Sequence, residues 1–144
     1  FLNAYFVEFP QKNAINFGDG YKQMVKYVKE NEYKYKAIYI SGYYWRPYIF
    51  TLFWKAYDPG LYQRERSIEH FGKYYFSGAQ WDKSGIYFGQ FDINFYSHIK
   101  TENRQETLFV LAKPEFERNK RKFKKFAVID GKYAKEVFVA GILK

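Results

Sequence analysis

Cysteine is absent from the chain of 144 residues, and this excludes a disulfide framework and cysteine-ligated zinc sites. Long apolar runs are absent as well. The longest candidate, residues 48–54, is far shorter than the roughly 20 residues that a membrane helix needs. The chain begins with Phe1 rather than methionine, so we expect it to be a piece excised from a longer protein. The absence of a membrane-spanning segment from this chain therefore says nothing about the longer protein.

The sequence also lacks the motifs of several enzyme classes. It contains no HExxH zinc pattern, no GxSxG nucleophile elbow and no Walker loop. Its two histidines, His70 and His98, are far apart in the chain. Gly18-Asp19-Gly20 resembles the start of a phosphate loop, but it has no third glycine and no preceding strand. We therefore expect no catalytic residue, no metal and no cofactor in this chain.

Two carboxylates beside aromatic residues leave a hydrolase open as an alternative. Asp82 follows Trp81, and Asp92 follows Phe91, as in a pair of residues that handles a glycan. Glycoside hydrolysis needs its two carboxylates roughly 5 to 9 Å apart, and spacing along the chain does not fix that distance. Surface loops explain the same residues more simply, so these are weak candidates.

Aromatic residues and positive charge are abundant instead. Aromatics make up 24% of the chain, with 16 Tyr and 16 Phe, which indicates half-exposed rings as well as core. The net charge is +9, and many lysines fall in residues 22–36 and 113–125. We expect the second run to be a solvated loop or hairpin face, with contact to an anionic partner as the alternative. Nucleic acid is not the expected partner, because no RNP1, KH or helix-turn-helix signature accompanies the charge.

The hydrophobic pattern predicts the α/β class, with α+β as an alternative, in one soluble domain over residues 1–144. We expect a layered sandwich of a mixed sheet with two main helices, an early strand–helix crossover and late antiparallel hairpins. The pattern places an extended segment at residues 1–10, helices at 16–30, 47–57 and 61–69, and strands at 36–41, 73–77, 86–91, 107–112, 122–129 and 137–142.

Both main helices have a predicted apolar face. In the first, the spacing i, i+3, i+4, i+7 predicts that Tyr21, Met24, Val25 and Val28 face the core, with Asn16 or Asp19 as the cap. In the second, Arg46-Pro47 opens the helix and Asp58-Pro59-Gly60 ends it. Its predicted buried stripe, which fixes the helix to the sheet, consists of Phe50, Phe53, Trp54 and Tyr57.

The segment between the strand and the second helix is the candidate contact surface. It follows the carboxyl end of a strand, where ligands of open α/β sheets often bind, and it precedes a helix amino terminus, which favours anions. Aromatic faces beside an arginine suit a sugar, a phosphate or a lipid headgroup. Packing of the turn, or docking on a neighbouring domain, is the alternative. The candidate residues are Tyr43, Tyr44, Trp45, Arg46 and Tyr48.

Residues 20–63, under a third of the chain, resemble part of a known family. The sequences GYKQMVKYVKEN, KAIYIS and RPYIFTLFWKAYDPGLYQ are similar to the C-terminal soluble domain of dolichyl-phosphate-mannose–protein mannosyltransferase-like proteins. That family comprises polytopic, lipid-carrier-dependent glycosyltransferases and includes aminoarabinose transferase-like enzymes. The matching positions are Tyr21, Lys22, Tyr39, Pro47, Tyr48, Ile49, Phe50, Leu52, Phe53, Tyr57, Asp58, Pro59, Tyr62 and Gln63.

The resemblance implies a parent whose N-terminal bundle of membrane helices carries the catalytic acid. This chain would then be an accessory domain on the extracytoplasmic face of the cytoplasmic membrane. Its partners would be that transmembrane region and a polyprenyl-phosphate sugar or a glycan acceptor. The domain would shape access to the active site or stabilise the bundle. The alternative is a stand-alone, basic, aromatic-rich module that binds glycans or nucleic acid.

Overall fold

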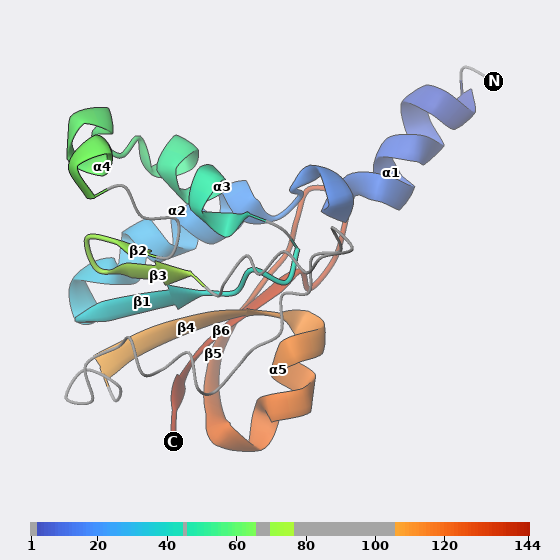
Figure 1. Ribbon diagram of the computed structural model, residues 1–144. Coiled ribbons are helices and arrows are strands. Elements are labelled where there is room, and N and C mark those ends of the chain that lie inside the picture. The colour runs from blue at the N-terminus through green and yellow to red at the C-terminus, as the bar shows by residue number, and fades with distance from the viewer. Residues whose placement is uncertain (1–2, 45, 66–69, 77–105) are drawn as a thin grey trace, which may run out of the picture.

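The computed structural model describes residues 3–44, 46–65, 70–76 and 106–144 (Figure 1). Besides α-helices and strands, these ranges contain a π-helical turn, η1, and the 3₁₀ turns η2, η3 and η6. In chain order the elements are η1 (Ala4–Glu8), α1 (Phe9–Asn13), η2 (Ala14–Phe17), α2 (Tyr21–Asn31), η3 (Glu32–Lys34), β1 (Ala37–Ile40), α3 (Pro47–Lys55), α4 (Pro59–Glu65), β2 (His70–Phe71), β3 (Tyr74–Phe76), β4 (Thr107–Ala112), α5 (Lys113–Asn119), η6 (Lys120–Lys122), β5 (Phe123–Ile129) and β6 (Phe138–Leu143).

The strands form one mixed sheet in the order β2-β3-β1-β4-β6-β5. β1 is parallel to both of its neighbours, β3 and β4, whereas the other pairs are antiparallel. Helices α2, α3 and α4 lie over one face of the sheet and α5 lies on the other (Figure 1). The predicted α/β layered fold is confirmed, and so is the late hairpin, which is β5 and β6. The strand predicted at residues 86–91 lies outside the described residues.

Alternation along β1 and β4 divides the core between the two faces of the sheet. On β1, Ile38 and Ile40 belong to the cluster under α2, and Tyr39 belongs to the cluster that contains Phe116 of α5. Successive side chains of a strand point to opposite faces, so this division follows directly from the period of two. On α2 the predicted apolar face is confirmed, because its four residues are all buried: Tyr21, Met24, Val25 and Val28.

The start of α2 differs from the prediction. The helix begins at Tyr21, and its N-cap is Gly20 at φ 90°, a left-handed conformation that a side chain would strain. Asp19 is not the cap. Its carboxylate instead accepts hydrogen bonds from three successive backbone N–H groups in the loop between β5 and β6, those of Lys132, Tyr133 and Ala134, at 2.7, 2.9 and 2.8 Å.

Two other segments were predicted wrongly. Residues 1–10 were expected to be extended, but η1 and α1 form a helical arm over residues 4–13 that projects from the body (Figure 1). An ion pair one helical turn apart, Lys12 Nζ to Glu8 Oε2 at 2.9 Å, lies on this arm. Residues 113–125 were expected to be a solvated loop or hairpin face, which is correct for the exposed Lys124 and Lys125 of β5 but wrong for their first half, which is α5. Pro114 stands in its first turn, and Phe116 is buried against the sheet.

The turns around α3 follow the prediction more closely. Pro47 is the first residue of α3, and Pro59 is the first residue of α4. The Asp58 carboxylate accepts a hydrogen bond from the N–H of Leu61 at 2.7 Å, so Asp58 caps α4 as predicted. Helix α4 begins at Pro59, two residues earlier than predicted, and the predicted positions 66–69 lie outside the described residues.

Candidate functional site

The carboxyl ends of β1 and β4 lie side by side, and the chain leaves them in opposite directions. From β1 it continues through α3 and α4 to β2 and β3, and from β4 it continues through α5 to β5 and β6 on the other side. Such a switch point is where ligands of open α/β sheets usually bind. Ser41 to Arg46 follow β1 at this point, and Glu115 follows β4.

A buried hydrogen bond joins these two strand ends. The Ser41 hydroxyl donates to Oε2 of Glu115, and both residues are buried. The same carboxylate oxygen accepts the N–H of Ala112 at 3.3 Å, while Ser41 Oγ accepts the N–H of Tyr43 at 3.1 Å. A buried carboxylate needs hydrogen-bond donors to offset its lost hydration. Ser41 and Glu115 therefore clamp the turn after β1 to the start of α5.

Tyr43 and Tyr44 follow this clamp and pack edge to face, with ring centroids 5.1 Å apart. Tyr44 also packs against Phe138 of β6 at 5.5 Å. Burial, together with the nearby Tyr43 and Glu115, raises the pKa of Tyr44 to about 12. The Tyr44 hydroxyl is consequently protonated at neutral pH. Tyr44 is half-buried against the main core cluster, and Tyr43, which precedes it in the same turn, is likewise partly exposed.

The remaining candidates in this segment are placed differently. Tyr48 is half-buried in the first turn of α3 and packs against the main core cluster. Arg46 is half-exposed and has φ 33°, a left-handed conformation that redirects the chain into α3. Trp45 lies outside the described residues. The structure therefore brings Tyr43, Tyr44, Arg46 and Tyr48 to the switch point, but Tyr44 and Tyr48 serve mainly as packing.

The predicted aromatic stripe on α3 is only half buried. Phe50 stacks on Tyr21, with ring centroids 4.3 Å apart, and Tyr57 packs on Phe71 at 4.7 Å. Phe53 and Trp54, in contrast, are 70% and 38% exposed, so the prediction was wrong for them. The side of α3 that faces inward is centred on Pro47 and Thr51, both buried. Thr51 can occupy this position because its hydroxyl donates to the carbonyl oxygen of Pro47 at 2.8 Å.

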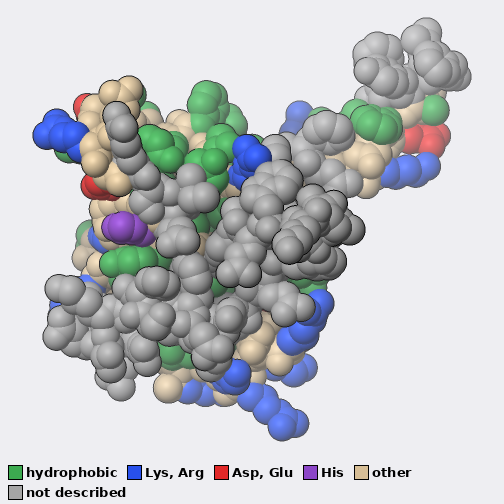
Figure 2. Space-filling model, viewed as in Figure 1, with side chains coloured by type: hydrophobic (Ala, Val, Ile, Leu, Met, Phe, Trp, Pro, Cys, Tyr) green, Lys and Arg blue, Asp and Glu red, His purple; other side chains and the backbone are tan. Residues whose placement is uncertain are grey.

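The exposed aromatics of α3 lie beside a row of lysines on α2. Helices α2 and α3 pack against each other, and Lys22, Lys26 and Lys29 line a groove of about 450 Å³ together with Trp54. Figure 2 shows hydrophobic side chains in green over α3 at the top of the molecule. We call this surface the α2–α3 face. It consists of Lys22, Lys26, Lys29, Ile49, Phe53 and Trp54.

A second groove, of about 600 Å³, shares Lys22, Gln23 and Trp54 with the first. Phe9, Phe50 and Tyr133 give it apolar walls, while Lys22 and Lys132 stand among its lining residues. The Gly18–Gly20 loop is part of its lining too. That loop follows η2 rather than a strand, and its carboxylate holds the β5–β6 loop, so its likeness to a phosphate loop is superficial.

The hydrolase candidates Trp81, Asp82 and Asp92 lie outside the described residues. Within the described ranges, no three His, Asp or Glu side chains gather as a metal site would need. Among the helices described, none has the length and hydropathy to cross a bilayer.

Sequence reasoning missed Ser41 and Glu115. The one local signal for this clamp is the position of Glu115. It is the third residue after the N-cap Ala112 and directly follows Pro114, and a glutamate at this position often bonds back to the N-cap backbone.

Comparison with known proteins finds no match: no family model, no curated protein and no solved structure is significantly similar to this chain.

Proposed function

We propose that the chain is the accessory, extracytoplasmic C-terminal domain of a lipid-carrier-dependent membrane glycosyltransferase. The proposal starts from the resemblance of residues 20–63 to that family. These residues fold as the consecutive elements α2, β1, α3 and α4, so the similar stretch is one continuous structural unit.

One observation carries the proposal. The motif residues divide into a folding set and an outer set. Tyr21, Tyr39 and Pro47 are buried and hold the unit together, whereas Ile49 and Phe53 are 40% and 70% exposed. Large hydrophobic side chains exposed together mark a contact surface rather than a requirement of the fold. A domain that sits on a membrane-embedded partner has a use for such a surface.

In this role the domain supplies contacts and not chemistry. Tyr43 and Arg46 at the switch point are the residues we propose for contact with the transmembrane region, a polyprenyl-phosphate sugar or a glycan acceptor. Arginine and aromatic rings suit phosphate and sugar, respectively. The domain would thereby shape access to the catalytic centre of the membrane region or stabilise that region, and no cofactor is needed here.

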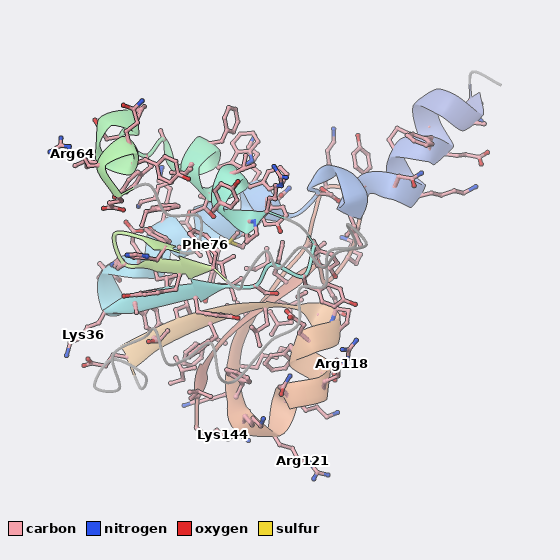
Figure 3. The ribbon with its side chains drawn as sticks, in the orientation of Figure 1. Lys36, Arg64, Phe76, Arg118, Arg121 and Lys144 are labelled. Atoms are coloured by element: carbon pink, nitrogen blue, oxygen red, sulfur yellow. The ribbon has the colours of Figure 1, made fainter. Side chains whose placement is uncertain are left out.

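The complete reading frame tests this proposal. We expect several membrane-spanning segments, each of about 20 apolar residues, before Phe1. In the full-length protein, Arg46→Gln should lower transfer of sugar to the acceptor while the protein remains in the membrane. The matched change Arg64→Gln, on exposed α4, should leave transfer unchanged (Figure 3). A start codon at the beginning of this chain, with no preceding spans, would overturn the proposal.

A stand-alone binding module is the second candidate. It is favoured by the exposed Arg118, Arg121 and Lys122 after β4, and by β5, where the Lys124 ammonium lies 5.9 Å from the centroid of the Phe126 ring, which is 44% exposed. Cations beside an aromatic ring suit single-stranded nucleic acid. The test is retention on heparin and on oligonucleotides at low salt, with a steep loss of affinity as salt rises. Absence of retention removes this candidate.

A further inference from the structure

The α2–α3 face combines exposed aromatics with ordered cations. Phe53 and Trp54 form an edge-to-face pair, with ring centroids 4.8 Å apart, and they are 70% and 38% exposed. Ile49 lies one turn earlier on α3 and is 40% exposed. Burying these side chains would be favourable, because the removal of apolar surface from water drives association.

The lysines are placed to act with these rings. Lys22, Lys26 and Lys29 recur every three or four residues, so they form one row along α2, and all three are exposed. The Lys22 ammonium lies 5.1 Å from the centroid of the Trp54 ring, which joins the row to the aromatic pair. Among the described residues that line the groove between them, Glu30 is the single acidic one against three lysines.

This arrangement matches the chemistry of an anionic lipid surface. Trp and Phe partition to the boundary between headgroups and acyl chains, while lysines extend to the lipid phosphates. A second copy of the chain is disfavoured as the occupant, because its lysine row would meet an identical row. The face is also the outer side of packed helices, which suits a broad, flat partner.

We propose that the α2–α3 face binds the surface of an anionic lipid bilayer, with Phe53 and Trp54 at headgroup level and Lys22, Lys26 and Lys29 on lipid phosphates. Lipid binding by this face adds to the proposed function, and it depends on that function only for which membrane of the cell the domain contacts. Binding to vesicles is measured on the chain alone, and the reading frame is read separately. Vesicle binding can therefore fail while the reading frame still places the chain in a glycosyltransferase. Vesicle binding can also succeed when the reading frame shows no membrane-spanning segments.

The experiment measures partition into vesicles of phosphatidylglycerol and phosphatidylcholine, in a ratio of about 3:7, against vesicles of phosphatidylcholine alone. We expect binding to the anionic vesicles only, weakening as salt shortens the screening length. Tryptophan emission should shift to the blue on binding. Trp54→Phe keeps the apolar contact, so it should retain binding and lose most of that shift.

Matched variants at the opposite end of the molecule provide the control. Lys22→Gln, Lys26→Gln and Lys29→Gln together should weaken partition on the order of 100-fold, because each lysine near such a surface contributes about 1 kcal/mol. Arg118→Gln, Arg121→Gln and Lys122→Gln remove the same charge from the α5 side of the sheet, where Figure 3 shows Arg118 and Arg121 projecting. This second set should change partition less than about threefold.

A second pair separates aromatic contact from charge. Phe53→Ser should weaken partition about tenfold, and Phe126→Ser, which also replaces an exposed phenylalanine, should leave it unchanged. Equal losses from the two charge sets would overturn the proposal, as would absence of binding at low salt. So would a dimer in solution that Phe53→Ser dissociates, since that result would assign the face to a second copy of the chain.

Discussion

Asp19 and Lys132 are 113 positions apart in the chain, and the backbone N–H of Lys132 donates a hydrogen bond to the Asp19 carboxylate at 2.7 Å. The N–H groups of Tyr133 and Ala134 bind the same carboxylate. A side chain at the entrance to α2 thus holds the β5–β6 loop in place, and with it one wall of the groove beside Trp54.

Replacing Asp19 by alanine should therefore destabilise the domain. Three N–H groups lose a charged acceptor, and Lys132 and Tyr133 are exposed enough for water to replace part of it. We expect a loss of about 2 kcal/mol in the free energy of unfolding, measured by urea denaturation. Asp130→Ala is the matched control, because the Asp130 carboxylate accepts one backbone N–H in the same loop, that of Glu136 at 2.7 Å, and should cost less. A larger loss for Asp130→Ala would contradict this account.

The same contact predicts a dependence on acid pH. Burial raises the pKa of Asp19, but the hydrogen bonds from Ala134, Tyr133 and Lys132 together outweigh it, so the folded pKa lies below the ordinary value. Stability from the Asp19 carboxylate is then fully present above the unfolded pKa of about 3.9. It is lost as pH falls through the folded pKa. Urea midpoints measured from about pH 5 downward should fall less steeply for Asp19→Asn than for the unaltered chain.

The raised pKa of Tyr44 predicts a loss of folding stability at alkaline pH. Its folded pKa of about 12 lies above the unfolded value of about 10, so folding favours the protonated hydroxyl. That contribution is complete below about pH 10 and is lost as pH rises toward the folded pKa. Tyr44→Phe should therefore reduce the fall in stability between about pH 10 and pH 12, measured by urea denaturation. Tyrosinate absorbance should also show one late-titrating group fewer, and an unchanged titration would refute the assignment.

The Ser41–Glu115 clamp predicts strong coupling between two buried residues. Ser41→Ala leaves the Glu115 carboxylate without its hydroxyl donor, and we expect a loss of about 2 to 3 kcal/mol in the free energy of unfolding. Ser41→Ala should cost less when Glu115 is already glutamine, because no buried charge then remains to be satisfied. The measurement is a double-mutant cycle with a coupling energy above about 1 kcal/mol. Additive losses would show that the two side chains act independently.

Truncation of two phenylalanines of α3 should have very different effects on stability. Phe50→Ala removes a ring stacked on Tyr21, and we expect a cost of about 3 kcal/mol in the free energy of unfolding. Phe53→Ala removes an exposed ring, so stability should change by less than about 0.5 kcal/mol. Thermal or urea unfolding of the two variants compares them directly. Similar losses would mean that Phe53 is buried in solution.

The features that were predicted correctly from the sequence mostly lie within single helices or hairpins. The face of α2 and the β5–β6 hairpin were predicted correctly, since each follows from a period within one segment. The burial of α3 was only half predictable, because helical spacing identifies which residues share a side and not which side meets the sheet. That orientation depends on the left-handed turn at Arg46, and the spacing of Phe53 and Trp54 carries no trace of it.

The contacts of Asp19 and Glu115 could not be predicted for a different reason. Asp19 stands directly before a helix, where aspartate usually caps, and its actual partners lie in a loop far along the chain. Glu115 lies in a run of basic residues that composition assigns to solvent, yet it is buried opposite Ser41. Both side chains satisfy groups brought close by the sheet, and a pattern within one segment cannot contain that information.

The central position of β1 has a consequence for synthesis of the protein. Both of its neighbours, β3 and β4, follow it in the chain, and the N–H of Ser41 reaches its partner only at Val110. A ribosome delivers residues in order, so the aromatic half formed by α2, β1 and α3 must remain uncovered until β4 has emerged. Completion of the sheet is therefore expected to wait for β4, and the nascent aromatic segments are the ones that a chaperone would need to shield in the meantime.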